Sequence, residues 1–499
     1  MTSFTLDPKL IPLFLGGILA WMVFVVCFGY FGSRGRHGGD RFLTGGRDMN
    51  GFLIFCTLGA TIIGTGSTVG AISDGFSHAW GGALFGTGSA LGVLLLSTFS
   101  GIREKGFITM SEEAQYYFGG RRIVRQVMGF MMFMIEIVWL GNHINGGSTY
   151  LSFALGIDPI WCKLMTAVGF GAYVFVGGYV AVVKADVIQF LAIVVGFSVI
   201  AARAIPMAGG YGEIANVFAA AGKPGAMGFY GLGSYGALAG VSLVLAMALN
   251  VVGCPGNRTR IYTAKSPRTA RLAFLGQGSM MLLWSFVMAV IGMSCFAIMT
   301  HNGHRLATGD YAFPYMATQV MEPAVGLVFM ICGLSAAVSS GGSSSISGIT
   351  ILLTDVYPSL TGRRIPQERY NLVSRLALLA ALTVAFVITI FVSDMIAYIQ
   401  KVVGAFLPGV AVTMLLGRFW RRSTWQGALA AVFTGTSLGV AIVLVPPFAD
   451  WIKATFGGPA IPATLVSLAA FLAGTLLSKR DTTPDADRVA AVMAARVGK

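Results

Sequence analysis

Residues 60–68 read Ala-Thr-Ile-Ile-Gly-Thr-Gly-Ser-Thr and lie in the middle of a long apolar segment. Two glycines and several hydroxyl side chains at this place weaken a helix that would otherwise cross a membrane without interruption. A second interruption, Gly-Cys-Pro-Gly at residues 253–256, lies in another apolar segment, where the proline removes a backbone donor. These two broken segments decide which fold we expect and where we expect a binding site.

The composition indicates an integral membrane protein. Of the 499 residues, 55% are apolar and 11% are charged, and the mean hydropathy is +0.76, whereas a soluble domain carries about 25% charge. These values exclude a soluble globule, a disordered chain and a coiled coil. The net charge of +14 comes from short basic clusters between apolar runs, which is typical of cytoplasmic loops and argues against nucleic-acid binding. The six cysteines contain no CxxC pair, so we interpret them as buried small apolar residues.

Thirteen apolar segments are long enough to cross a membrane, which predicts an all-α polytopic protein. Their approximate bounds are 10–32, 51–76, 79–101, 126–149, 159–182, 185–206, 236–257, 272–299, 324–347, 373–393, 396–417, 425–446 and 459–478. With the N-terminus outside and the C-terminus inside, 27 of the 34 basic residues fall on the inner side. Because basic residues concentrate in cytoplasmic loops, this orientation is the one we predict.

The two broken segments open two sets of five segments, residues 51–206 and 236–417. Broken helices at matching places in two halves indicate an inverted-repeat transporter with its binding site at the breaks. The alternative is that glycine and proline are frequent in membrane helices for other reasons. In this division residues 10–32 and 425–478 are peripheral helices and 479–499 a short cytoplasmic tail, all within one transmembrane domain, 1–499.

A serine-rich stretch follows in the ninth segment, where residues 335–345 contain six serines. Small residues there would let two helices approach closely, which is the structural interpretation. The functional interpretation is an alkali-cation site, since hydroxyls and free carbonyls suit sodium better than zinc or copper. Four ionisable residues also lie in or beside apolar segments and are functional candidates, although those near helix ends could simply reach the membrane surface: Glu136, His143, Asp186 and Asp394.

Several separate stretches resemble one family, the sodium:solute symporters. They are Ala336-Ala337-Val338-Ser339-Ser340 with Asp355-Val356-Tyr357 after it, Gly177-Gly178-Tyr179 with Asp186-Val187-Ile188-Gln189 after it, and the basic loop with Arg260 and Ala264-Lys265. The resemblance covers about segments two to ten. It implies a leucine-transporter-type core of five plus five helices. The Gly-x-Pro sequence at 253–255 is closer to the proline, pantothenate and monocarboxylate carriers than to the sugar carriers, although those carriers usually have histidine where this chain has Gly256.

The resemblance also implies a set of site residues. Sodium would be bound by the backbone carbonyls of Ala60, Ile63 and Ala336 and by the hydroxyls of Ser339 and Ser340. Asp186 matches a carboxylate on the sodium exit path, which in some members forms a second sodium site with two serines; here those positions are Gly342 and Ser343. The solute is expected at the two breaks and on the fourth segment, beside Gly64, Gly66, Ser67, Trp139, Asn142, Gly253, Cys254 and Gly256.

We therefore expect sodium-coupled symport of a small organic solute, such as an amino acid, a monocarboxylate or a pantothenate-like compound, across a bacterial-type plasma membrane. Sodium would be the coupling ion, no other cofactor and no catalytic residue is expected, lipid and solute are the partners, and a monomer would suffice. The main alternative is a proton-coupled transporter of the same fold. A transporter-like sensor, a channel and a membrane enzyme fit less well, because the chain shows no output domain, no symmetric pore ring and no convergent catalytic side chains.

Overall fold

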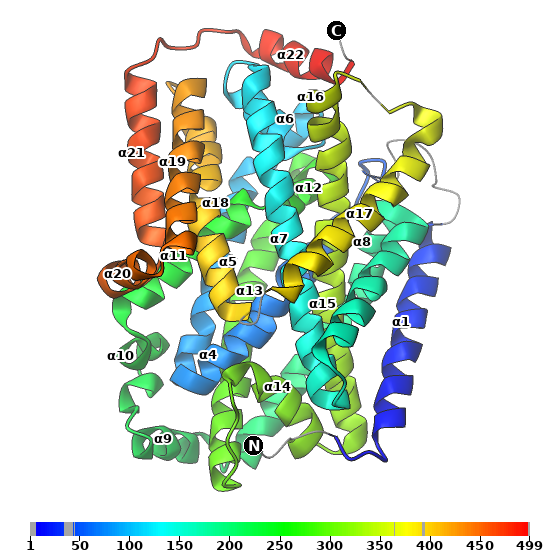
Figure 1. Ribbon diagram of the computed structural model, residues 1–499, viewed down its shortest axis with the longest axis vertical. Helices are drawn as coiled ribbons and strands as arrows, with labels where there is room; N and C mark the ends of the chain where they lie inside the picture. The colour runs from blue at the N-terminus through cyan, green and yellow to red at the C-terminus, as the bar shows by residue number, and fades with distance from the viewer. Residues whose placement is uncertain (1–5, 34–42, 44, 364, 392–394, 498–499) are drawn as a thin grey trace.

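The computed structural model describes residues 6–33, 43, 45–363, 365–391 and 395–497, and these form a bundle of helices (Figure 1). The longer helices are α1 (Ile11–Ser33), α3 (Gly51–Ile62), α5 (Ala83–Leu96), α7 (Arg122–Leu155), α8 (Pro159–Met207), α11 (Ala237–Gly253), α13 (Pro267–His301), α15 (Pro323–Ile351), α17 (Tyr370–Ile390), α18 (Met395–Phe419), α19 (Trp425–Leu444), α21 (Ala460–Leu476) and α22 (Asp485–Val497). The shorter ones are α4 (Ala71–His78), α6 (Met110–Tyr117), α9 (Tyr211–Ala220), α10 (Leu232–Tyr235), α12 (Pro255–Thr263), α14 (Ala312–Tyr315), α16 (Tyr357–Thr361) and α20 (Pro446–Phe456).

Within the described ranges, eight helices are long and apolar enough to cross a membrane, or ten if each of two bent pairs is one span. The all-helical membrane architecture is thereby confirmed, but the count of thirteen is not. The predicted segments 159–182 and 185–206 both lie in α8. The predicted segment 51–76 is divided between α3, a π-helical turn at Gly66–Gly70 and α4, so no part of it alone has the length of a span.

Both predicted interruptions are real breaks. Helix α3 begins after Asn50, whose side chain accepts a hydrogen bond from the Leu53 amide at 2.9 Å, and it ends at Ile62 because Ile63 leaves the helical region with ψ 71°. Helix α11 ends at Gly253, the chain is extended at Cys254, and α12 restarts at Pro255 at an angle of 46°. Proline suits the first position of a helix, where no amide donor is needed.

Helix α8 bends at Gly178, which adopts φ 58° and ψ −151°. A residue with a Cβ would be strained in this conformation, so glycine is what permits the bend. The bend separates the two predicted segments, and it places Tyr179 and Asp186 on the second arm facing α12. The serines of α15 do not interrupt that helix, because hydroxyls such as those of Ser335 and Ser345 donate to the carbonyl four residues earlier, both at 2.7 Å.

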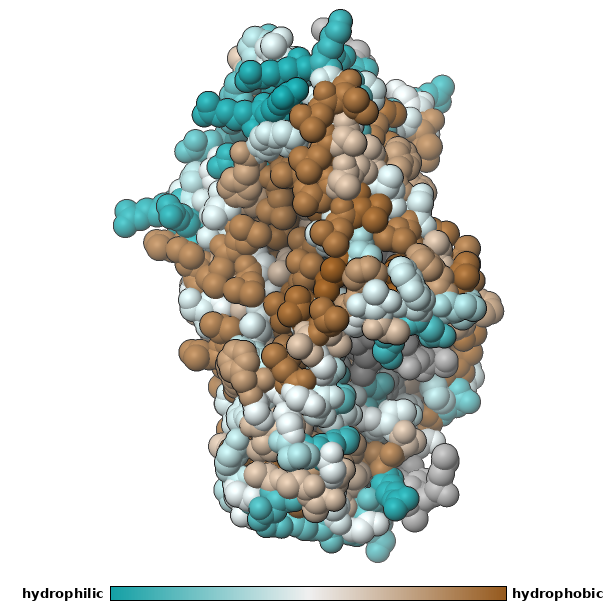
Figure 2. Space-filling view, turned by 90° about the vertical axis from the view of Figure 1, so that its left-hand side faces the viewer, coloured by the Kyte–Doolittle hydropathy of each residue, from teal (hydrophilic) through white to brown (hydrophobic). Residues whose placement is uncertain are grey.

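Helix α15 packs against α7 and α8, and α3 packs against α8, α13 and α15. Helices α1 on one side and α19 and α21 on the other flank this centre in Figure 1. The α19–α21 face carries a broad apolar band beneath a hydrophilic end (Figure 2). Helix α22, in the predicted tail 479–499, lies across that end beside α6. The start of α1 and helix α22 lie at opposite ends of the molecule, while the orientation in the membrane and the division into five plus five helices remain predictions.

Candidate functional site

The serines of α15 lie against the break in α3. The Ser339 hydroxyl donates to the Ala60 carbonyl at 2.9 Å, and the Ser340 hydroxyl is within 3.1 Å of the same carbonyl and 2.9 Å of the Thr61 carbonyl. The Ala336 carbonyl lies 3.3 Å from the Ser339 hydroxyl. Hydrogen bonds thus join four of the five residues predicted to bind sodium, and the fifth, Ile63, directly follows the end of α3.

This cluster has the chemistry of an alkali-cation site. All five residues are buried, and the break frees carbonyl oxygens that an intact helix would use for its own hydrogen bonds. Gly64 keeps the two helices close, because a Cβ on it would lie 2.7 Å from the Ser340 hydroxyl and 2.9 Å from the His143 ring. Among the described residues, no three His, Cys, Asp or Glu side chains gather as they would around a transition metal.

About one helical turn from Ser339 and Ser340, the guanidinium of Arg260 lies between the same two helices, α3 and α15. Its Nη2 donates to the hydroxyls of Thr57, Thr61 and Ser343 at 3.1, 2.7 and 2.6 Å, and it lies 3.6 Å from the Asp186 carboxylate. The Thr57 hydroxyl in turn donates to Asp186 at 2.5 Å. The residues predicted for a sodium exit path or a second sodium site, Asp186 and Ser343, therefore come together, but around an arginine.

The second break is held by a carboxylate from α7. Glu136 is 1% exposed and accepts a hydrogen bond from the Gly256 amide at 2.9 Å, at the first turn of α12. Arg260 donates to the carbonyl of the same Gly256 at 2.8 Å. In the described part of the chain, Glu136 has no cationic side chain within 4 Å, so the helix N-terminus is its nearest source of positive charge.

A cavity of about 40 Å³ lies between the two breaks. Six of the predicted substrate residues line it: Gly64, Gly66, Ser67, Trp139, Cys254 and Gly256. The other two do not. Asn142 donates instead to the Thr65 hydroxyl at 3.2 Å, and Gly253 faces Leu407 of α18. The volume is close to that of one water molecule, so the helices must separate to admit an organic solute.

Polar atoms without partners surround this cavity. The indole nitrogen of Trp139 and the amide oxygens of Asn250 and Asn257 are buried and make no hydrogen bond within the described ranges. His143 also lines the cavity, stacks on Trp139 and lies 3.2 Å from the Thr65 hydroxyl. Because buried polar groups are costly when unpaired, these atoms are suited to bind a polar solute.

Charged networks close the end of the molecule that carries α22. Glu113 of α6 accepts hydrogen bonds from Arg258 at 3.1 Å, Tyr117 at 2.8 Å and Tyr262 at 2.5 Å, which ties α6 to the broken helix α12. Asp355, part of the Asp-Val-Tyr sequence that follows the serines, pairs with Arg125 at 2.7 Å. The cavity is therefore separated from this end by a layer of paired side chains.

A family model described as the sodium:solute symporter family matches residues 42–435. The chain belongs to this family. Symporter relatives include a sodium/pantothenate symporter of Haemophilus influenzae, 24% identical over 93% of this chain and 96% of the relative, and a sodium/glucose cotransporter of Vibrio parahaemolyticus, 23% identical over 86% and 85%. A human sodium/myo-inositol cotransporter is 24% identical over 87% of this chain and 67% of the cotransporter.

Solved structures agree on the fold of this symporter. A Na+-coupled sialic acid symporter in an outward-open state superposes with a TM-score of 0.76 at 16% identity, over 94% of this chain and 99% of the other. A nucleobase-cation-symport-1 family transporter in a closed conformation gives a TM-score of 0.58 at 13% identity, over 93% of this chain and 99% of the other. The protein is thus a multi-pass sodium-coupled symporter rather than an enzyme, with sodium as its coupling ion.

Sequence reasoning missed part of this symporter's site. It placed Arg260 in a basic loop, whereas the side chain is buried in the centre of the molecule. It also missed Thr57 and Thr61, whose spacing of four residues puts both hydroxyls on one face of α3 and could have indicated a polar partner. Asp394 lies outside the described residues.

Proposed function

We propose that the protein carries one sodium ion and one small, net-neutral solute of the amino-acid type into the cell by alternating access, across a bacterial-type plasma membrane. The observation that carries the proposal is the contact of Ser339 and Ser340 with the carbonyls at the break of α3. Sodium would bind there, with the carbonyls of Ala60, Ile63 and Ala336, and would draw α3 and α15 together.

Arg260 favours a single sodium ion. The region where Ser343 and Asp186 would hold a second ion already contains the guanidinium charge, 2.6 Å from the Ser343 hydroxyl. A second cation there would meet repulsion in a region of low dielectric. One oxygen of Asp186, Oδ1, makes no hydrogen bond in the described structure, so it is available to receive sodium as the ion leaves inward.

The charges of the site favour a net-neutral solute. Glu136 and Asp186 are two buried carboxylates and Arg260 is one buried cation, so with His143 neutral the group carries one negative charge, which one sodium ion balances. An anionic solute would unbalance it, and unbalanced charge is costly in a membrane interior. Moreover, Glu136 already occupies the N-terminus of α12, the kind of helix end that binds anionic groups in such transporters.

These features favour an amino acid over a monocarboxylate or a pantothenate-like anion. The ammonium group of a zwitterion would find acceptors in the unpaired amide oxygens of Asn250 and Asn257, which line the cavity, and the charge of Glu136, which is bound to the Gly256 amide, would favour it. Trp139, whose indole N–H is unpaired, is a donor rather than an acceptor and would donate a hydrogen bond to the carboxylate of the same solute. Solute specificity would thus come from the second break, and sodium dependence from the first.

The test uses the purified protein in liposomes with an inward sodium gradient and an inside-negative potential. We expect uptake of L-alanine or L-proline that requires sodium, and much weaker uptake of propionate and pantothenate. An inside-negative potential should accelerate uptake, because each cycle moves one net charge, worth about 2.3 kcal/mol per 100 mV. Uptake driven equally by a proton gradient with potassium in place of sodium would instead support the proton-coupled alternative.

A further inference from the structure

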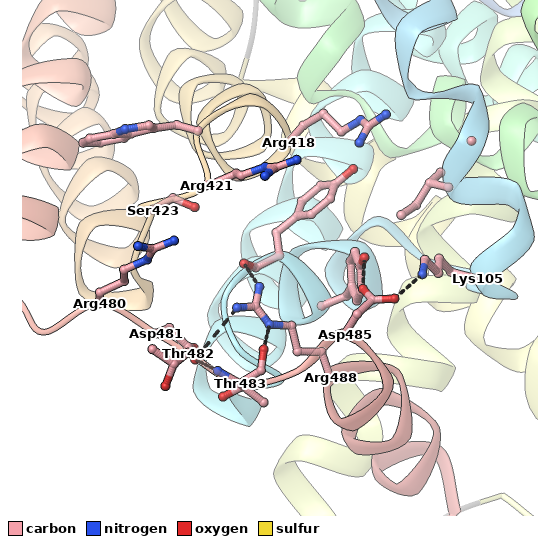
Figure 3. Close-up of a pocket in the computed structure, with 16 residues that line it drawn as sticks. Lys105, Arg418, Arg421, Ser423, Arg480, Asp481, Thr482, Thr483, Asp485 and Arg488 are labelled. Carbon is pink, nitrogen blue, oxygen red and sulfur yellow. Dashed lines mark hydrogen bonds and ion pairs between the residues drawn. The ribbon is translucent and has the colours of Figure 1, made fainter.

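A second pocket, of about 900 Å³, lies at the α22 end of the molecule and shares no lining residue with the cavity between the two breaks (Figure 3). It is formed by the end of the span that contains α5, by α6, by the turn between α18 and α19, and by the segment that leads from α21 into α22. Five basic residues and two acidic ones, Asp481 and Asp485, are among the residues that line it.

Both carboxylates of this pocket are already engaged. Asp485 accepts a hydrogen bond from Lys105 at 2.5 Å and another from Tyr116, and the bond from Lys105, with that from Tyr116, lowers the pKa of the Asp485 carboxyl. Asp481 accepts from the Thr483 amide at 2.8 Å and lies 3.9 Å from Arg488. The two acidic residues therefore neutralise Lys105 and Arg488, which lie on the α22 side of the pocket.

Three guanidinium groups remain without a carboxylate partner within 4 Å in the described part of the chain: Arg418, Arg421 and Arg480. In Figure 3 Arg418 and Arg421 lie across the pocket from Asp485 and Arg488, and Arg480 lies beside Asp481. Arg418 makes a long hydrogen bond of 3.5 Å to the Thr98 carbonyl and lies over the Phe419 ring. The pocket therefore has an uncompensated charge of about +3.

The position of these arginines relative to apolar surface indicates where the membrane ends. Phe419, beside Arg418, is 57% exposed, and Leu477, three residues before Arg480, is 89% exposed. Trp420 lines the pocket at the same level, as expected for an aromatic residue at a membrane interface. Figure 2 shows the same change from an apolar band to a hydrophilic end on this face. The pocket thus lies at the depth of the lipid headgroups.

We propose that this pocket binds a phosphate-bearing anion and that its natural ligand is the headgroup of an anionic phospholipid. One guanidinium group can donate two parallel, charge-assisted hydrogen bonds to the oxygens of a phosphate group. The hydroxyls of Ser423, Thr482 and Thr483 line the same space and supply further donors. Basic pockets between membrane helices on the cytoplasmic side are suited to such headgroups.

Occupancy would bear on transport, because one wall of the pocket touches the closed end of the site. Tyr117 lines the pocket and donates to Glu113, which also accepts hydrogen bonds from Arg258 and Tyr262 of α12. A headgroup that holds α6 and the α18–α19 turn together therefore stabilises the contacts that keep α12 in place. This inference does not depend on the identity of the solute.

The test measures lipid binding directly, so it is independent of transport. The purified full chain in neutral detergent is titrated with phosphatidylglycerol, with phosphatidylcholine and with inorganic phosphate at constant ionic strength, and native mass spectrometry and thermal stability are read. The variant is Arg421→Gln with Arg480→Gln. The matched control is Arg268→Gln with Arg271→Gln, which removes two exposed arginines at the start of α13, outside the pocket.

We expect the wild-type chain to retain phosphatidylglycerol and to be stabilised by it, and phosphatidylcholine to do neither. The pocket variant should bind about tenfold more weakly or worse, since it loses charge-assisted hydrogen bonds, while the control keeps wild-type affinity. Equal affinity of the pocket variant and the wild type would overturn the proposal, as would an equal loss in the control. Inorganic phosphate that matches phosphatidylglycerol at the same concentration would overturn the lipid assignment.

Discussion

Replacing Ser339 with alanine tests the sodium site at the place where its geometry is best defined. The hydroxyl is fully buried and lies 2.9 Å from the Ala60 carbonyl and 3.3 Å from that of Ala336. Alanine removes one of five proposed ligands and changes little else, because Ser340 still contacts the Ala60 carbonyl at 3.1 Å. Losing one interaction with a charged partner costs about 1.5–3 kcal/mol, which corresponds to a sodium midpoint raised by a factor on the order of 10 to 150.

The assay is thermal stabilisation of the purified protein by sodium, with choline keeping the ionic strength constant, and binding of radioactive sodium at equilibrium. Ser345→Ala is the matched control, because the Ser345 hydroxyl is equally buried in the same helix but donates only to the Gly341 carbonyl of its own helix, at 2.7 Å. A sodium midpoint in Ser339→Ala equal to that of the wild type would refute the assignment. A shift of the same size in Ser345→Ala would show that any serine of α15 acts through packing alone.

Four further changes probe the surrounding structure. Glu136→Gln keeps an acceptor for the Gly256 amide but removes a charge, so competition assays should show weaker binding of L-alanine and a relative gain for propionate. Arg260→Gln vacates the region around Ser343 and Asp186, so the Hill coefficient for sodium should rise from about one toward two. Gly64→Ala would bring a Cβ within 2.7 Å of the Ser340 hydroxyl, so both the melting temperature without sodium and the stabilisation by sodium should fall. Asp485→Asn should expose Arg488 of α22 to faster cleavage by trypsin at neutral pH. Because the pKa of Asp485 is lowered, the stabilisation of α22 by this carboxylate is present above the ordinary pKa of about 3.9 and is lost as the pH falls below that value. A spin label on α22 would report this loss as increased mobility.

Much of the arrangement around the two breaks was predictable because it depends on local sequence patterns, namely interrupted apolar segments and a cluster of serines. Glycines and a proline inside apolar segments predicted the breaks that the structure shows at Ile63 and Cys254. The crowding of serines in 335–345 pointed to the helix that faces the first break, and hydrogen bonds join the two. Local chemistry was sufficient here, because a broken helix needs outside partners for its free backbone groups wherever it lies.

The rest depended on three-dimensional arrangement, which residue types do not specify. Gly178 was part of a stretch that resembles the family, but only its positive φ shows that it bends α8 and turns Asp186 toward α12. Arg260 looked like part of a cytoplasmic loop, because arginine in a short polar stretch usually is. It is buried because α12 continues inward from the second break, and four oxygen atoms on α3, α12 and α15 accept hydrogen bonds from its two terminal nitrogens, while its Nε makes none among the described residues. The number of spans stays a prediction, because α8 comprises two helices that meet at Gly178, and length and hydropathy alone do not determine which helices cross the membrane.

The placement of Arg260 offers a physical account of coupling between sodium and solute. Helices α3 and α15 are joined at two levels one turn apart: at the upper level by Ser339 and Ser340, where sodium would bind, and at the lower level by Arg260. Arg260 belongs to α12, and the Gly256 amide in the first turn of α12 donates a hydrogen bond to Glu136 beside the solute cavity. A solute that pulled on Glu136 and Gly256 would therefore move the arginine that holds the same two helices as the proposed sodium ion. If both ligands act on the α3–α15 contact, reciprocal coupling requires that each change the affinity for the other by the same factor.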